Sequence, residues 1–296
     1  MFDQANHLRR LVRQCATPDT PASDRRPGMI VATSGKGGVG TTTIAVNLAV
    51  ALARCGNRTV LVDADPRGGN VALHCRLEDH FSVADVFAAR KTVCESLQPG
   101  PGEIRVLAGA WGLRYPADYP PAAGERLLSQ LQNLQSDADL VVVDVGSGPS
   151  GLRRRFLEAA DVKLLVTTPE TASVLDTYAA IKALAGSDKP HSIHTLVNLA
   201  GSAETAQRVH ARLAEACRRF LGVETVAAGR VPAEAQLAAT ARTATPLALG
   251  TTQTGAAREL QRLATTLADA VAAAKARRPE GQFGSKCQSR IYQQVF

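Results

Sequence analysis

A glycine-rich loop between an apolar run and a helical pattern constrains the fold of this chain more than any other feature. The apolar run is MIVAT, residues 29–33, the loop is SGKGGVG, and the helical pattern TTTIAVNLAVALARCG covers residues 41–56. A strand, a glycine-rich turn and a helix N-terminus together form a cradle of backbone N–H groups for phosphate oxygens. We therefore predict a phosphate-binding loop made of Gly35, Lys36, Gly37, Gly38, Val39, Gly40, Thr41, Thr42 and Thr43. The alternative is a structural turn that happens to be rich in glycine.

The loop departs from the usual P-loop in the position of its positive charge. In the pattern G-x-x-x-x-G-K-[ST], a lysine comes just before the hydroxyl residue that meets Mg²⁺. Here Thr41 occupies the lysine position and Thr42 the hydroxyl position, while Lys36 lies early in the loop. Loss of a cation about 4 Å from a phosphate forfeits up to a few kcal/mol at an effective dielectric near 20. The backbone N–H groups and the helix dipole remain, so we expect nucleotide binding to survive and hydrolysis to be slow.

Apolar runs of strand length alternate with amphipathic helical runs along the rest of the chain. Such alternation indicates a mostly parallel sheet covered by helices on both faces, which is the three-layer α/β fold of P-loop NTPases. A short helix capped by Ser82 is also expected. We predict strands near 58–65, 104–108, 139–145, 162–168, 193–198 and 223–229, and helices near 122–135, 151–159, 171–185, 202–221 and 254–276.

Aspartates come at the ends of two of these strands, where ligands of a parallel sheet bind. Asp63 and Asp65 lie in VLVDADPRGGN, and Asp144 lies in VVVDVGSGPSG. In-line phosphoryl transfer needs one carboxylate that holds Mg²⁺ and another that orients the attacking water. We therefore assign Thr42, Asp63 and Asp144 to Mg²⁺ and Asp65 to catalysis, although a single aspartate at such a position is also a common turn cap. Substitute positive charge would come from Arg67 or from Arg153–Arg155, unless that arginine run is a solvated helix face.

Composition divides the chain into segments. We expect a short amphipathic helix over 1–14, a proline-rich linker over 15–28, the nucleotide-binding domain over 29–276 and a basic tail over 277–296. The net charge of +7 is carried mostly by the ends, with +2 in residues 1–27 and +4 in residues 275–296. An acidic partner or an anionic membrane would be met at these ends, whereas the nearly neutral middle argues against a broad nucleic-acid-binding face.

Cysteine and histidine patterns give no metal signature. The six cysteines include no C-x-x-C pair. We therefore interpret them as reduced thiols of a cytosolic protein. We interpret His191 and His194 as surface histidines rather than as a metal-binding pair. No apolar run approaches the roughly 18 residues of a membrane span, and the charged N-terminus is not a secretory signal.

The quoted motifs resemble those of the deviant-Walker ATPases of the MinD/ParA family. The resemblance rests on KGGVG, on DAD at the end of the second strand and on VVVDVGSGPSG, and it covers about residues 28–270. Segments 164–184, 196–222 and 229–249 are most similar to the FlhG group, also called YlxH or FleN, which sets flagellar number and placement. The resemblance implies ATP, ADP and Mg²⁺ as ligands and a slow ATPase that forms a homodimer with ATP.

Family roles carry over to particular residues of this sequence. Lys36 matches the lysine that reaches across the dimer to the phosphates of the other subunit, which implies a catalytic role. Asn198 matches an asparagine on the adenine edge, and Val231 and Pro232 match a segment that packs against the base. An asparagine at a strand end is also often a simple cap.

Partners are implied by the two ends of the chain. DQANHLR matches the family element D-Q-A-x-x-L-R, which stimulates the GTPase of the partner FlhF, through Asp3, Gln4, Ala5, Leu8 and Arg9. Flagellar basal-body components are further implied partners. The tail places Cys287, Ile291 and Val295 on one face of a possible membrane-contacting helix, with disorder as the alternative. The implied location is cytoplasmic and peripheral at the inner membrane or cell pole.

Two other functions stay open at this point. The first is a degenerate nucleotide-binding or nucleotide-free scaffold for another polar organelle, because relatives associated with cellulose (BcsQ) and pili (CpaE/TadZ) also lack the P-loop lysine. The second is a ParA-type DNA positioner, which the nearly neutral middle of the chain disfavours, so no specific nucleic-acid partner is expected.

Overall fold

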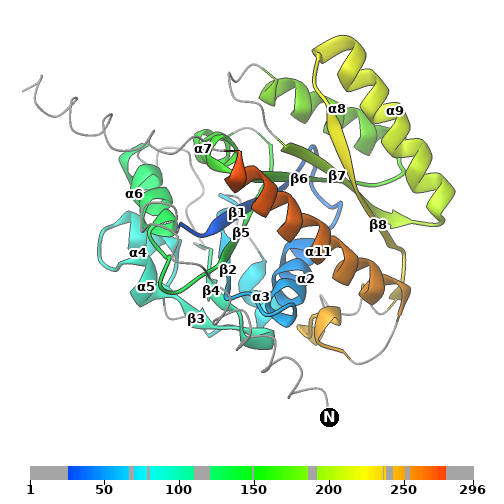
Figure 1. The fold of residues 1–296 in the computed structure, drawn as a ribbon. Helices are drawn as coiled ribbons and strands as arrows, with labels where there is room; N and C mark the ends of the chain where they lie inside the picture. The colour runs from blue at the N-terminus through cyan, green and yellow to red at the C-terminus, as the bar shows by residue number, and fades with distance from the viewer. Residues whose placement is uncertain are drawn as a thin grey trace, which may run out of the picture.

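The computed structural model describes residues 26–66, 70–78, 81–109, 121–148, 150–185, 192–235, 237, 243–250 and 254–277. These residues form one eight-stranded sheet in the order β3-β4-β2-β5-β1-β6-β7-β8 (Figure 1). Every neighbouring pair is parallel except β3 with β4, which is antiparallel. The expected α/β fold with a mostly parallel sheet is therefore confirmed.

The strand and helix bounds follow the sequence pattern to within a few residues. The strands are β1 Gly28–Ser34, β2 Thr59–Asp63, β3 Gln98–Pro99, β4 Arg105–Leu107, β5 Leu140–Ser147, β6 Val162–Thr167, β7 Ser192–Ala200 and β8 Thr225–Pro232. The longer helices are α2 Thr41–Arg54, α6 Pro121–Gln132, α7 Gly151–Ala159, α8 Thr171–Leu184, α9 Ala203–Leu221 and α11 Gly255–Ala276. The short ones are α3 Val71–Cys75, α4 Val83–Phe87 and α5 Val93–Ser96, with 3-10 turns at Pro101–Glu103 and Leu247–Leu249.

Helices cover both faces of the sheet and give it three layers. Helices α2 and α11 pack on one face, where residues such as Leu48 and Leu263 meet Ile30 of β1. Helices α4 to α7 cover the other face beside β1, β2 and β5 (Figure 1). Helices α8 and α9 cover that same face beside β6 and β7, because Leu165 packs with them while its neighbour Leu164 packs with the α2 side.

The short elements α3, α5 and β3, which lie between β2 and β4, were not expected from the sequence. Helix α5 has only four residues, and reciprocal hydrogen bonds between Thr92 and Glu95 form a capping box that fixes its first turn. The helix expected after Ser82 is present as α4, with a capping box formed by Ser82 and Asp85. Hydrophobic periodicity needs about two turns to be visible, so elements of this length leave no periodic signal.

One expectation about the surface was wrong, and one segment is described only in part. Of the linker expected over 15–28, only residues 26–28 are described, where Arg26 pairs with Asp161 at 3.2 Å and Gly28 begins β1. His194 is only 4% exposed, since it lies within β7 between β6 and β8 instead of on the surface. Burial lowers the pKa of His194, so it stays neutral near physiological pH. His191 lies outside the described residues.

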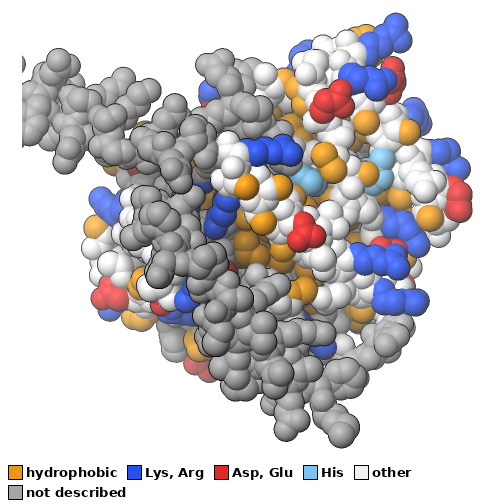
Figure 2. Space-filling model, viewed as in Figure 1, with side chains coloured by type: hydrophobic (Ala, Val, Ile, Leu, Met, Phe, Trp, Pro, Cys, Tyr) orange, Lys and Arg blue, Asp and Glu red, His pale blue; other side chains and the backbone are white. Residues whose placement is uncertain are grey.

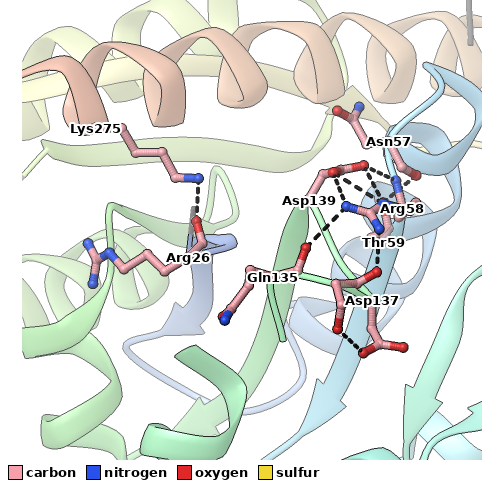
Figure 3. Close-up of polar contacts among 9 residues, drawn as sticks. Arg26, Asn57, Arg58, Thr59, Gln135, Asp137, Asp139 and Lys275 are labelled. Carbon is pink, nitrogen blue, oxygen red and sulfur yellow. Dashed lines mark hydrogen bonds and ion pairs between the residues drawn. The ribbon is translucent and has the colours of Figure 1, made fainter. Parts of the chain in front are cut away.

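Polar contacts close the amino-terminal edge of the sheet, where the parallel strands begin (Figure 3). Arg58, just before β2, donates from its backbone N–H and its guanidinium to Asp139, just before β5, at 2.8 Å in each case. Lys275 at the end of α11 donates to the backbone carbonyl of Arg26 at 2.6 Å (Figure 3). These contacts lie at the amino ends of the strands, whereas ligands of a parallel sheet bind at the carboxyl ends.

The face shown in Figure 2 carries exposed side chains of both charge signs among apolar and uncharged ones. Exposed arginines are frequent on α9, where Arg208, Arg212, Arg218 and Arg219 all reach solvent. Glu204 and Glu215 alternate with them, so the helix does not present an unbroken basic stripe. None of the helices in the described part of the chain is both long and apolar enough to span a membrane.

Candidate functional site

The predicted phosphate loop connects β1 to α2 at the carboxyl edge of the sheet. Gly40 precedes α2 with φ 87°, in the left-handed region that favours glycine. A Cβ atom at Gly40 would lie 2.5 Å from Nδ2 of Asn198, and one at Gly35 would lie 2.2 Å from the backbone of Asp176. Two of the loop glycines are therefore required by close approach of β7 and α8. The loop is built into the fold and is not an incidental turn.

The first turn of α2 is arranged to receive an anion. Its N-terminus has no side-chain cap and no acidic residue, so the helix dipole is not offset locally. Thr41, at the usual lysine position, is 8% exposed and adds no charge. The next hydroxyl, on Thr42, interacts with the carboxylate of Asp144 and lowers its pKa, as expected of a hydroxyl beside the metal-binding carboxylate.

The fold brings Asp63 and Asp144 together. They are direct partners in the register of β2 and β5, and they are 1% and 0% exposed. Asp63 accepts backbone N–H bonds from Asp65 at 3.2 Å and Val71 at 3.3 Å, and Asp144 accepts one from Gly146 at 3.0 Å. The second oxygen of Asp144, Oδ2, is buried and has no hydrogen-bond partner among the described residues. A buried carboxylate oxygen without a donor fits a cation.

Burial changes the protonation of this pair. Desolvation raises the pKa of Asp144 to about 6, although the Thr42 hydroxyl and the Gly146 N–H oppose the rise. Desolvation also raises the pKa of Asp63 well above its usual value, and the negative charge of Asp144 raises it further. Carboxylates whose pKa values are shifted by burial and by a neighbouring charge are typical of functional sites, because catalysis and metal binding need such tuned groups.

Asp65 lies against the carboxyl end of β5. A Cβ atom at Gly146 would meet its Oδ2 at 2.2 Å, so the carboxylate sits directly over that glycine. Its charge raises the pKa of both Asp63 and Asp144. The structure thus places all three predicted aspartates at one point of the sheet edge, beside Thr42.

The hydroxyl and carboxylate oxygens at this edge of the sheet fit Mg²⁺ as a partial set of ligands. Among the described residues, no group of three or more His, Cys, Asp and Glu side chains forms a complete metal cage. Mg²⁺ keeps several waters and is usually held by one or two carboxylates together with substrate phosphates. Thr42 and Asp144, supported by Asp63, supply such a partial set.

Lys36 turns away from its own phosphate loop. Its Nζ donates to Oε2 of Glu170 at 3.0 Å, and the two side chains are 34% and 70% exposed. Glu170 precedes α8, so the lysine lies along the outer surface of the site. An exposed pair of this kind is weak and readily exchanged for another anion.

Asn198 joins the end of β7 to the phosphate loop. Its Nδ2 donates to the carbonyl of Val39 at 2.8 Å, while its Oδ1 is buried and has no hydrogen-bond partner among the described residues. Val231 is fully buried within the core on the α2 side, and Pro232 after it is half-buried. Asn198 is therefore more than a strand cap, because it ties β7 to the phosphate loop.

Arg153 is a residue for which the sequence left two alternatives open, substitute charge for the site or a solvated helix face. A solvated helix face was considered for the run Arg153–Arg155, but Arg153 is 9% exposed. Its Nε donates to Oγ1 of Thr33 at 2.9 Å and its Nη1 donates to the carbonyl of Gly148 at 3.1 Å. Arg154 and Arg155 do form surface pairs, with Glu158 and Glu125. The residue spacing of α7 alone did not show which arginine points inward.

Other predicted residues lie outside the part of the chain that the structure describes. They are Arg67, the partner-binding residues Asp3, Gln4, Ala5, Leu8 and Arg9, and the tail from residue 278 onward.

Comparison with known proteins shows the family of the chain. The family model "CobQ/CobB/MinD/ParA nucleotide binding domain" matches residues 30–271. The chain is 34% identical to "Antiactivator FleN" of Pseudomonas aeruginosa over 204 residues, which cover 69% of this chain and 73% of that protein. It is 29% identical to "Flagellum site-determining protein YlxH" of Helicobacter pylori over 191 residues, or 62% of each protein.

Solved structures with the same fold include MinD proteins. The MinD of Pyrococcus horikoshii, complexed with Mg-ADP, superposes with a TM-score of 0.67 at 23% identity, covering 85% of this chain and all of that one. The MinC:MinD complex of Aquifex aeolicus gives a TM-score of 0.65 at 25% identity, covering 82% of this chain and 96% of the matched one. The family match and the FleN match together show that the chain belongs to the MinD/ParA family of nucleotide-binding proteins and, within it, to the FlhG group of FleN and YlxH.

Proposed function

We propose that the protein is an ATP-dependent switch of the FlhG type, which regulates the number and placement of flagella. The observation that carries the proposal is the site at the end of β1, β2 and β5, where an uncapped helix N-terminus faces Asp63, Asp65 and Asp144. The similarity to FleN and YlxH, whose names refer to an antiactivator and to flagellum site determination, supports the biological role.

In this proposal the loop binds the phosphates of ATP through backbone N–H groups and the dipole of α2. Thr42 and Asp144 would hold Mg²⁺, which would offset the negative charge that develops on the phosphates. Asp65, above Gly146, orients the attacking water. Hydrolysis is slow because Thr41 supplies no cation, while binding depends mainly on the backbone and the metal.

The base would be recognised at Asn198. The bond from Nδ2 to Val39 leaves Oδ1 as the free group of the amide, and Oδ1 can only accept hydrogen bonds. The exocyclic amine of adenine is a donor, whereas the corresponding carbonyl of guanine is an acceptor. This arrangement supports ATP over GTP as the ligand.

Dimerisation would use Lys36. In the single chain it pairs with Glu170 at the surface, from which it can move to the phosphates bound by a second copy. The mass of the protein in solution with Mg-ADP and with Mg-ATP tests this role. We expect the wild type to form a dimer with Mg-ATP but not with Mg-ADP. Lys36→Ala should stay monomeric with either nucleotide. Lys182→Ala, which changes an exposed lysine on α8, should behave as the wild type does. An ATP-dependent dimer of Lys36→Ala would refute the switch as described.

The partners in this proposal are an FlhF-type GTPase, reached by the first helix, and flagellar basal-body components. The protein would act in the cytoplasm, peripheral at the inner membrane or cell pole, with the basic tail meeting anionic lipid. Deletion of residues 1–14 should leave nucleotide binding intact and abolish stimulation of an FlhF-type GTPase. Unchanged stimulation would remove this partner from the proposal.

A nucleotide-free scaffold for another polar organelle is the second candidate, because Thr41 replaces the P-loop lysine. A ligand that binds only the folded chain raises its thermal midpoint. An unchanged midpoint in saturating Mg-ATP would favour the scaffold over the switch.

A further inference from the structure

The loop of residues 146–148, which includes the last two residues of β5, is held in place by a chain of hydrogen bonds that the proposed function does not use. The hydroxyl of Thr33 donates to the carbonyl of Gly146 at 2.7 Å. Arg153 donates from Nε to that hydroxyl at 2.9 Å and from Nη1 to the carbonyl of Gly148 at 3.1 Å. Two carbonyls of the loop, on either side of Ser147, are therefore tied to β1 and α7.

This chain of bonds lies in the interior. Thr33 is 0% exposed and Arg153 is 9% exposed, whereas Arg154 and Arg155 on the same helix form surface pairs. Removal of a guanidinium from water costs free energy, and hydrogen bonds in the low-dielectric interior must offset that cost. Because the bonded carbonyls belong to one loop, the arrangement fixes the position of that loop.

The loop in question faces the phosphate site. A Cβ atom at Gly37 would lie 3.8 Å from Oγ of Ser147, so Ser147 stands opposite the phosphate loop. Gly146 lies under the carboxylate of Asp65 and follows the metal-binding candidate Asp144 by two residues. A Mg²⁺ ion held by Thr42 and Asp144 would accompany the terminal phosphates of ATP, and this would place the terminal phosphate beside residues 146–148. ADP has no phosphate there.

We propose that Arg153, acting through Thr33, is a positioning residue that holds residues 146–148 for the terminal phosphate of ATP. The inference rests on the nucleotide binding proposed above and adds the device by which the site distinguishes ATP from ADP. Arg153 does not touch the phosphate itself. It sets the position of the loop that does.

Binding of Mg-ADP and of a non-hydrolysable Mg-ATP analogue to Arg153→Gln, measured by titration calorimetry, tests the inference. We expect the affinity for the ATP analogue to fall about tenfold or more and the affinity for ADP to change by less than about twofold. Arg154→Gln, which alters the exposed neighbour paired with Glu158, should bind both nucleotides as the wild type does. Equal losses for the two nucleotides would show a merely structural role and overturn the inference, as would unchanged binding of both.

Thr33→Val provides a second variant of nearly unchanged shape, and it carries the test if Arg153→Gln fails to fold. It removes the bond to Gly146 and the acceptor for Arg153, so it should lose affinity for the ATP analogue selectively. The double variant Thr33→Val/Arg153→Gln should lose no more affinity for the ATP analogue than the more affected single variant does, because both residues belong to one chain of hydrogen bonds. Additive losses would contradict that linkage.

Wild-type binding separates this inference from the proposed function. A wild-type chain that binds neither nucleotide would overturn both, whereas a chain that binds both with no selective loss in the variants would overturn the inference alone.

Discussion

At the scale of single residues, the site is defined by where its charges lie. Thr41 occupies the lysine position of the P-loop with a neutral, 8% exposed side chain, and Lys36 pairs with Glu170 at the surface. The negative charges of Asp63, Asp65 and Asp144, by contrast, gather at one point. Among the described residues, the phosphate loop therefore has more carboxylates than cations beside it, which favours binding of nucleotide together with a metal cation.

Restoring the missing cation should tighten nucleotide binding. Thr41→Lys places an ammonium about 4 Å from a phosphate, an attraction of up to a few kcal/mol at an effective dielectric near 20, from which desolvation of the lysine subtracts. We expect affinity for Mg-ATP to rise by about tenfold in titration calorimetry. Thr41→Gln, which is longer than threonine but uncharged, is the control. Equal affinities of the Lys and Gln variants would show that charge at this position is unimportant.

The raised pKa values of the buried aspartates predict a pH dependence of stability. Between about pH 4 and 6 the folded chain keeps Asp144 protonated while the unfolded chain has released that proton. The free energy of unfolding therefore falls as pH rises through this window, by at most about 3 kcal/mol for Asp144. Asp63 adds to the fall in the same direction.

Urea unfolding at several pH values checks this expectation. Asp144→Asn should flatten the pH dependence and be more stable than wild type at pH 7, because no charge is buried. Asp269→Asn, an exposed change on α11, should leave the curve unaltered. Binding of Mg²⁺ needs the deprotonated carboxylate, so metal affinity should weaken below about pH 6. A wild-type slope in Asp144→Asn would contradict the assignment.

At the scale of elements, the start of α2 depends on how closely β7 approaches it. Gly40 before the helix and Gly56 after it both have left-handed φ values, 87° and 89°. A Cβ atom at Gly40 would meet Asn198 at 2.5 Å, but one at Gly56 would meet nothing within 4 Å. The two positions have the same backbone requirement and differ in packing alone.

Alanine substitutions at Gly40 and Gly56 distinguish the cost of a left-handed backbone from the cost of a steric clash. Gly56→Ala should cost about 1 kcal/mol of unfolding free energy, from the left-handed backbone alone. Gly40→Ala should cost clearly more, because Asn198 must move and its bond to Val39 is disturbed. Adding Asn198→Ala to Gly40→Ala should cost less than the sum of the single changes, as measured by urea unfolding. Equal costs at the two glycines would mean that Asn198 yields freely.

At the scale of the whole molecule, the sheet separates stability from chemistry. Its amino edge is closed by contacts such as Asp161 with Arg26 and with the N–H of Met29, and by Arg58 with Asp139. Its carboxyl edge holds the phosphate loop and the aspartates. Changes at the two edges should therefore have different consequences.

Asp161→Ala tests this separation. It leaves the N–H of Met29 and the guanidinium of Arg26 without their carboxylate, which should lower the free energy of unfolding by about 2 kcal/mol. Nucleotide affinity, measured where the variant is fully folded, should not change. Glu158→Ala, which breaks an exposed pair with Arg154, should cost less than about 0.5 kcal/mol. A loss of nucleotide affinity in Asp161→Ala would show that the edges are coupled.

The sequence by itself determined the phosphate loop, the alternation of strands and helices and the aspartates at the strand ends. These features are local, since glycines, hydrophobic periodicity and capping residues such as Ser82 act within one or two turns of chain. The bounds of α7 followed directly from the sequence pattern, as expected for an amphipathic helix. Family membership followed from the same local motifs.

Only the tertiary structure decided which distant residues meet. β2 and β5 are neighbours in the sheet, so Asp63 faces Asp144 and their pKa values rise. The packing of α7 on β1 turned Arg153 inward to Thr33, and the placement of β7 between β6 and β8 buried His194. Neither outcome has a local signal, because burial of a polar side chain depends on what the rest of the chain places against it. The physical reason is that hydrophobic periodicity along one element shows which of its faces is buried. The residues that pack against that face depend on the order of the strands in the sheet, which periodicity does not contain.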